Sequence, residues 1–123
     1  MNRTKTILII EDNLLNMELA TELLELENWL VLQAENAHLG IHMARSKQPD
    51  LILMDIKLPG MDGLSATRKL KEDPKTKDIK VVAFTSHAMK SDYEKAMEVG
   101  CDGFITKPID VKKFTQEIRM YLT

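Results

Sequence analysis

The sequence contains one cysteine, Cys101, so an intramolecular disulfide is excluded and a reducing compartment such as the cytoplasm is indicated. No apolar run approaches the roughly 20 residues of a membrane span, and the N-terminal segment lacks the apolar region of a signal peptide. The net charge of −2 provides no basic excess for binding nucleic acid or a membrane surface. We therefore expect a cytoplasmic protein that binds neither nucleic acid nor membranes.

The chain has the composition of an ordinary globular protein, with 44% hydrophobic and 29% charged residues. At 123 residues it is long enough to bury a substantial core, and no low-complexity segment or linker divides it. We expect a single domain over residues 1–123.

Five short apolar runs alternate with segments of helical periodicity. The expected strands span residues 6–10, 29–34, 51–55, 79–84 and 102–106. The expected helix starts are Asn13, Asn36, Asp62 or Gly63, a capping box of Ser91 with Glu94, and Asp110. Leucines 15, 19, 23 and 26 would form the buried stripe of the first helix. In the last helix, Val111, Phe114, Ile118 and Leu122 share one face.

Alternating strands and helices predict a parallel sheet covered by helices on both faces and joined by right-handed crossovers. Residues 6–10 and 51–55 are the most apolar runs, so they should be the central strands. The predicted fold is therefore α/β, a flavodoxin-like doubly wound (βα)5 domain with a five-stranded parallel sheet in the order 2-1-3-4-5.

Asp55 is the first functional candidate, because it ends a strand that is apolar throughout. A buried charge is costly unless it is paired, so a carboxylate at this position does not serve stability. Leu58-Pro59-Gly60 then breaks the chain. Asp55 therefore falls at the carboxyl end of a strand, where open α/β sheets bind ligands.

Other polar residues converge on the same edge in this topology: Glu11-Asp12, Thr85 and Lys107 follow strands one, four and five. Three carboxylates so close would repel one another, and Mg²⁺ resolves that conflict in sites that also bind phosphate. A hydroxyl and an ammonium group could hold the remaining phosphoryl oxygens. Asp55 would be the nucleophile and would form an acyl phosphate.

These residues, together with Leu58-Pro59-Gly60-Met61-Asp62-Gly63 and Lys107-Pro108, resemble the receiver domain of bacterial two-component response regulators over nearly the whole chain. The resemblance implies that Asp55 accepts a phosphoryl group from a histidine of a kinase or phosphotransferase. It implies Mg²⁺ bound by Asp12, Asp55 and the backbone carbonyl of Lys57, with Glu11 acting through water. It also implies that Lys107 contacts the phosphoryl group.

The same resemblance makes Thr85 and Phe104 the switch residues, with Phe104 at a position where many members have tyrosine. The output would be phosphorylation-dependent protein binding through the face formed by helix four, strand five and helix five. The protein would not be an enzyme with a separate substrate, although autodephosphorylation is expected. A cis peptide between Lys107 and Pro108 is expected from the small cost of cis X–Pro bonds and from the resemblance.

Other interpretations remain open. A phosphatase of the haloacid-dehalogenase type would need a second acid where Lys57 stands, and a flavodoxin would place its phosphate against Glu11 and Asp12. A receiver domain excised from a hybrid histidine kinase is the main alternative. His38 and His42 have zinc-like spacing, but an exposed pair is favoured; for Asp62 an N-cap is favoured over a metal ligand.

Overall fold

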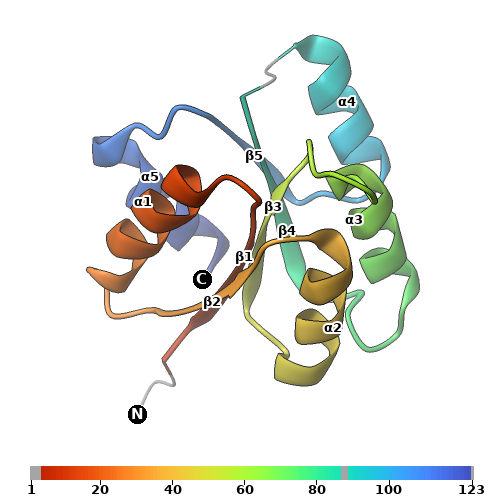
Figure 1. The fold of residues 1–123 in the computed structure, drawn as a ribbon, viewed down its shortest axis with the longest axis horizontal. Coiled ribbons are helices and arrows are strands. Elements are labelled where there is room, and N and C mark those ends of the chain that lie inside the picture. The colour runs from red at the N-terminus through yellow and green to blue at the C-terminus, as the bar shows by residue number, and fades with distance from the viewer. Residues whose placement is uncertain (1–3, 87–88, 123) are drawn as a thin grey trace.

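The computed structural model describes residues 4–86 and 89–122, and in this part of the chain five parallel strands form one sheet in the order β2-β1-β3-β4-β5 (Figure 1). The strands are β1 (Thr6–Ile10), β2 (Leu30–Ala34), β3 (Leu51–Asp55), β4 (Lys80–Thr85) and β5 (Gly103–Thr106). The helices are α1 (Leu14–Glu25), α2 (Ala37–Lys47), α3 (Gly63–Glu72), α4 (Lys90–Glu98) and α5 (Val111–Tyr121). The predicted fold class and strand order are confirmed.

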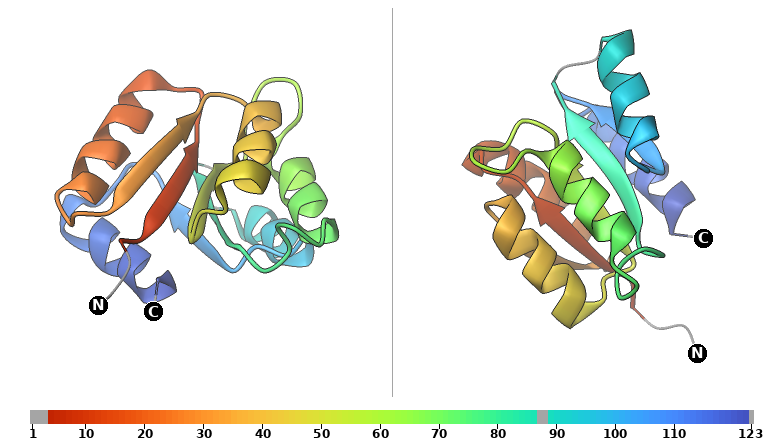
Figure 2. Two further views of the ribbon diagram at one scale, coloured as in Figure 1. Left: turned by 90° about the horizontal axis from the view of Figure 1, so that it is seen from below. Right: turned by 90° about the vertical axis from the view of Figure 1, so that its right-hand side faces the viewer.

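Two hydrophobic cores lie on opposite faces of the sheet, because successive strand residues point to opposite sides. Leu8 and Ile10 of β1 pack in the core beneath α2, α3 and α4. Ile7 and Ile9 pack in the core beneath α1 and α5. Figure 2 shows the two helix layers on either side of the sheet. All five residues of β3 are buried, as expected for a central parallel strand covered on both faces.

The buried face of α1 differs from the prediction. Met17, Ala20 and Leu24 pack on the sheet, whereas Leu15 and Leu26 are each 76% exposed. Leu19 is also exposed and Leu23 is half-buried. The prediction was wrong because leucines occur on every side of this helix, so their spacing alone does not show which face meets the sheet. Helix α1 consequently presents an apolar outer surface.

The start of α4 was also wrongly predicted. Its N-cap is Met89, and among the described residues no side chain caps the helix. Ser91 lies inside the helix rather than at its start, so the proposed Ser91–Glu94 capping box does not form. Only Ala96 of this helix is buried, which makes α4 the most lightly anchored helix in the described part of the chain.

The other helix starts agree with the prediction: the side chains of Asn13, Asn36, Asp62 and Asp110 each accept a hydrogen bond from a backbone N–H of the first turn. In α5 Phe114 and Ile118 are buried as expected, and Leu122 just after the helix is buried too, but Val111 is 57% exposed. Strands β2, β4 and β5 each begin one residue later than predicted, and β4 includes Thr85. Among the helices of the described chain, none combines the length and apolar content that spanning a membrane requires.

Candidate metal-binding and phosphoacceptor site

The carboxyl ends of four strands bring the predicted site residues to one edge of the sheet. Asp55 is the last residue of β3, and Glu11-Asp12 directly follow the neighbouring β1. Thr85 ends β4, next to β3 on its other side, and a backbone hydrogen bond of 2.8 Å joins its carbonyl to the N–H of Lys107. From β1 and β3 the chain continues into α1 and α3, which cover opposite faces of the sheet. This divergence occurs at the edge of the sheet where open α/β folds bind ligands.

Glu11, Asp12 and Asp55 form an acidic cluster in which one carboxylate oxygen from each residue lies within 4.8 Å of the others. Glu11 and Asp55 are buried, whereas Asp12 is exposed and open to solvent. Oxygen ligands that include one or two carboxylates and leave room for water suit Mg²⁺. The donor set therefore fits the predicted cation, with Asp12 on the side from which it would enter.

Lys107 is the cation of this site. Its Nζ lies 2.5 Å from a carboxylate oxygen of Glu11 and 3.5 Å from one of Asp55. The side chain is 10% exposed, and its ammonium lies 4.8 Å from the centre of the Phe84 ring. In this structure Glu11 is therefore the nearer partner of Lys107, a contact that the sequence did not predict. The same ammonium is close enough to reach a group bound to Asp55.

The pKa of Asp55 is raised from 3.8 to about 7. The main cause is burial, which disfavours the charged carboxylate; its hydrogen-bonded and negatively charged neighbour Glu11 raises the pKa further. Lys107 and the backbone N–H of Lys57 act in the opposite direction, and that N–H donates to Asp55 Oδ1 at 3.1 Å. A cation bound to the cluster would remove the repulsion and restore the charged carboxylate.

Gly63 is a site residue whose role the sequence did not reveal beyond its place at the start of α3. Its N–H donates to the carbonyl of Ile56 at 2.9 Å. A Cβ atom at this position would lie 2.1 Å from the backbone oxygen of Asp55, far inside contact distance. The absence of a side chain thus lets α3 begin directly against the backbone of Asp55, so glycine is required here for packing.

The predicted switch residues lie on the neighbouring strands β4 and β5, where Phe104 pairs with Ala83, two residues before Thr85. Thr85 is buried, and Phe104 is half-buried against the core beneath α2, α3 and α4. The Phe104 ring packs edge-on against Tyr93 of α4, with ring centres 5.6 Å apart. Tyr93 is 51% exposed and was not singled out from the sequence, because only the tertiary structure brings α4 against β5.

The structure also bears on three predictions about individual positions. The Lys107–Pro108 peptide is cis, the expected isomer. Asp62 caps α3 through its contact with the Ser65 N–H, and His38 and His42 are exposed. These positions therefore follow the structural interpretations favoured from the sequence.

Comparison with known proteins agrees with this geometry. Residues 7–119 match the model of the response regulator receiver domain. The chain is 42% identical to the polar-differentiation response regulator DivK of Brucella anthropi over 118 residues, 96% of each sequence. A solved receiver domain of the sensor histidine kinase PA1611 from Pseudomonas aeruginosa, with magnesium in its active-site cleft, has a TM-score of 0.89 and 25% identity, covering 98% of both chains. The chemotaxis protein CheY4 of Vibrio cholerae shares the fold, with a TM-score of 0.92 at 17% identity over 98% of this chain and 100% of that one.

The fold and the acidic cluster define a phosphorelay receiver of the flavodoxin-like class. The chain belongs to the response regulator receiver domain family of two-component systems. Its match to nearly the full length of DivK does not favour the alternative of a receiver excised from a hybrid histidine kinase.

Proposed function

We propose that Asp55 is the phosphoacceptor of this receiver and that Mg²⁺ is required for the transfer. The carrying observation is that Asp55 ends the central strand β3, belongs to the acidic cluster and lies 3.5 Å from the Lys107 ammonium. Asp12, Asp55 and the carbonyl of Lys57 would bind the cation, and Glu11 would act through water. The bound cation would neutralise the carboxylates and the incoming phosphoryl oxygens.

In the proposed step, an oxygen of the Asp55 carboxylate attacks the phosphorus of a phosphohistidine on a kinase or phosphotransferase. The P–N bond breaks as the P–O bond forms, the imidazole leaves with the bonding electron pair and takes up a proton, and Asp55 becomes an acyl phosphate. Lys107 would turn from Glu11 to a phosphoryl oxygen, and the Thr85 hydroxyl would hold another. Later attack by water on the phosphorus would break the P–O bond to Asp55, release inorganic phosphate and return Asp55 to the carboxylate, which is the autodephosphorylation expected from the sequence.

Phosphorylation by acetyl phosphate tests this assignment. With Mg²⁺, intact-mass spectrometry should detect one added phosphoryl group on the wild-type chain and none on Asp55→Asn. Asp78→Asn serves as the matched control, because Asp78 is exposed and lies outside the acidic cluster. Labelling of Asp55→Asn at the wild-type rate would show that another residue is the acceptor.

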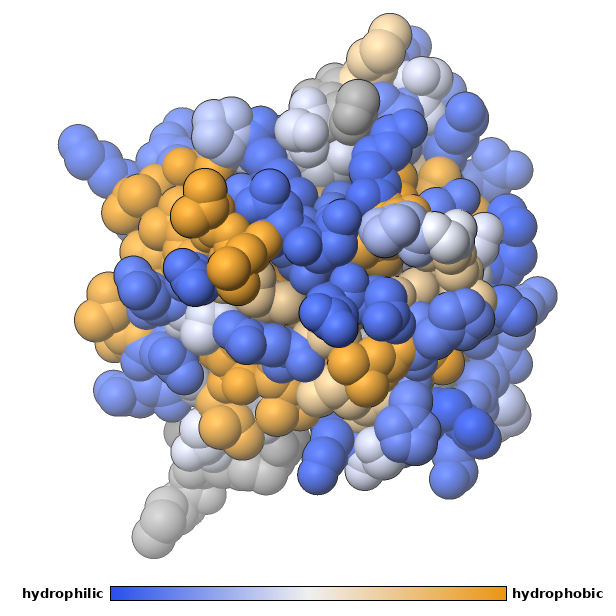
Figure 3. Space-filling model, in the orientation of Figure 1, coloured by the Kyte–Doolittle hydropathy of each residue, from blue (hydrophilic) through white to orange (hydrophobic). Residues whose placement is uncertain are grey.

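The exposed apolar side of α1 is the surface that we propose for the phosphohistidine donor. Leu14, Leu15 and Leu19 are 69%, 76% and 39% exposed, and they belong to the helix that begins two residues after Asp12. Figure 3 shows hydrophobic residues gathered on the side of the molecule where α1 lies. A donor must approach Asp55 across this side or the facing loops. Leu15→Gln should therefore slow transfer from a phosphorylated donor protein while leaving the rate with acetyl phosphate unchanged.

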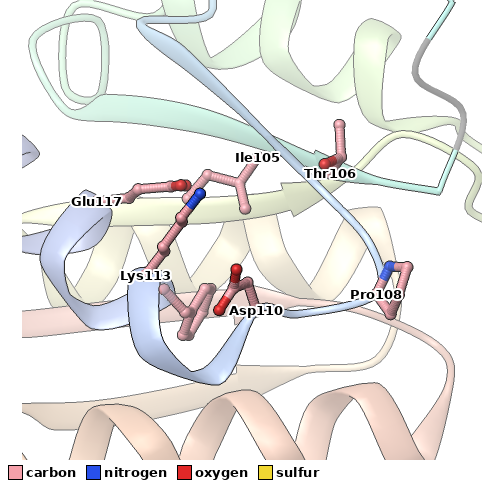
Figure 4. A pocket seen from close by; sticks show the side chains of 7 residues that line it. Ile105, Thr106, Pro108, Asp110, Lys113 and Glu117 are labelled. Carbon is pink, nitrogen blue, oxygen red and sulfur yellow. The ribbon is translucent and has the colours of Figure 1, made fainter.

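For the signalling output we propose the face formed by α4, β5 and α5. Tyr93 and Phe104 form its centre, and a pocket of about 220 Å³ lies between β5 and the start of α5 (Figure 4). Lys113 and Glu117 of α5 line this pocket together with Ile105 of β5. NMR of the phosphorylated protein should show the largest backbone shifts in these three elements. Shifts confined to the β1–α1 and β3–α3 loops would count against this output face.

A further inference from the structure

A groove separate from the output face runs between the starts of α1 and α2. It encloses about 430 Å³ beside the end of β2, a volume within the roughly 300–1,000 Å³ of typical ligand pockets. Its lining includes Asp12, Leu14, Met17, Gln33, Glu35 and Leu39. Gln33 Nε2 donates to the Thr21 hydroxyl at 2.9 Å and so ties β2 to α1. The groove is therefore bounded by fixed secondary structure on both sides.

The lining of this groove is apolar at its walls. Leu14 from α1 is 69% exposed and Leu39 from α2 is 41% exposed, and both line the same space. Met17 beside them is 6% exposed and belongs to the core beneath α1 and α5. Two exposed leucines from different helices, together with a buried methionine that lines the same space, can contact an apolar side chain of a partner.

The charge of the groove has one sign. Glu35 is exposed, and within residues 4–86 and 89–122 no lysine or arginine forms an ion pair with it. Asp12 is exposed too, but it belongs to the proposed cation site, so Glu35 supplies the charge that is left for a partner. Glu11, which also lines the groove, is already paired with Lys107. The other three pockets described for this chain each include basic side chains. Only an occupant that carries positive charge would complement this one.

We propose that this groove docks a basic, apolar helical segment of a partner protein, with a leucine-sized side chain between Leu14 and Leu39 and a lysine or arginine near Glu35. Apolar walls with acidic rims favour a helix that presents both residue types on one face. The groove also adjoins the acidic cluster through Asp12, so an occupant would lie next to the phosphoacceptor site. The proposal concerns binding alone and does not depend on Asp55 being the phosphoacceptor.

The test is a titration of the isotope-labelled full chain with a synthetic peptide of about 18 residues, long enough to form helix, that repeats leucine and arginine on one face. A second peptide keeps the leucines and replaces each arginine with glutamate. The basic peptide should shift the amide signals of Leu14, Gln33 and Leu39 in a saturable way, and the acidic peptide should not. Equal binding of both peptides, or shifts centred on α4 and α5, would overturn the proposal.

Single substitutions test whether peptide binding depends on the groove or only on general charge attraction. Glu35→Lys should weaken binding of the basic peptide about fivefold, whereas Glu72→Lys, an equal charge change at an exposed site on α3, should have a much smaller effect. Leu39→Gln should also weaken binding about fivefold, and Leu30→Gln, which changes an exposed leucine outside the groove, should not. All four variants should still be phosphorylated by acetyl phosphate at the wild-type rate. Equal effects of the groove variants and their controls would overturn the proposed groove without affecting the role of Asp55.

Discussion

Asp55→Asn should stabilise the metal-free protein, because the wild-type carboxylate is charged at a buried position. A rise of its pKa from 3.8 to about 7 corresponds to a penalty of about 4 kcal/mol at pH 7 and above. This penalty sets the upper limit of the gain, because a buried asparagine also loses hydration. We expect Asp55→Asn to gain about 2–4 kcal/mol, or roughly 8–16 °C in melting temperature for a domain of this size.

Two contacts explain why the substitution should remove little stabilising interaction. Asparagine keeps an oxygen that can accept the Lys57 N–H, and Lys107 keeps its closer partner Glu11 at 2.5 Å. The pH dependence follows from the sign of the shift. A carboxyl group whose pKa is raised by folding carries no penalty below the unfolded value near 4. The penalty develops as the pH rises toward 7, so the gain of the variant should grow over the same interval.

Calorimetry of both proteins in EDTA between pH 4 and pH 8 measures this gain, and Asp78→Asn is the control for removing an exposed charge. With saturating Mg²⁺ the two proteins should become equally stable, or the wild type should become the more stable one, because the cation stabilises the wild-type site. A variant no more stable than wild type at pH 7 in EDTA, or a gain that does not change with pH, would refute the electrostatic reasoning.

Three further predictions follow. Mg²⁺ at a hundredfold excess over its Kd should stabilise the wild type by about 2.7 kcal/mol, as measured by calorimetry. Asp12→Asn should lose most of this Mg²⁺-dependent gain but should have nearly wild-type stability in EDTA, because Asp12 is exposed. If the variant gains as much from Mg²⁺ as the wild type, Asp12 is not a ligand of the cation. The fluorescence emission of Trp29 should not respond to Mg²⁺, because this residue precedes β2 at the end of the sheet opposite the acidic cluster and lies against Arg119. Saturable quenching in a fluorescence titration would contradict this placement. Gly63→Ala should lower the free energy of unfolding in urea by about 1–3 kcal/mol and slow phosphorylation by acetyl phosphate, because the added Cβ would displace the backbone of Asp55. A wild-type unfolding free energy and a wild-type phosphorylation rate would show that the loop accommodates a side chain.

The order of the elements and the main site residues could be predicted from local sequence patterns. Apolar runs bounded by turn residues mark buried strands, and a parallel sheet with short crossovers brings their carboxyl ends together. Asp55, Asp12, Thr85 and Lys107 could be found in this way, because each lies within two residues of the end of a strand.

The buried faces of the helices and the pairing of the site residues depend on how the elements pack against one another. The leucines of α1 surround the helix, so the packing of Met17 and Ala20 on the sheet had to come from the three-dimensional arrangement. The close Glu11–Lys107 pair joins residues 96 positions apart. The need for glycine at position 63 likewise arises from the backbone of a neighbouring strand. Sequence patterns encode local structure and periodicity, whereas these features depend on distances between elements that meet only in the folded chain.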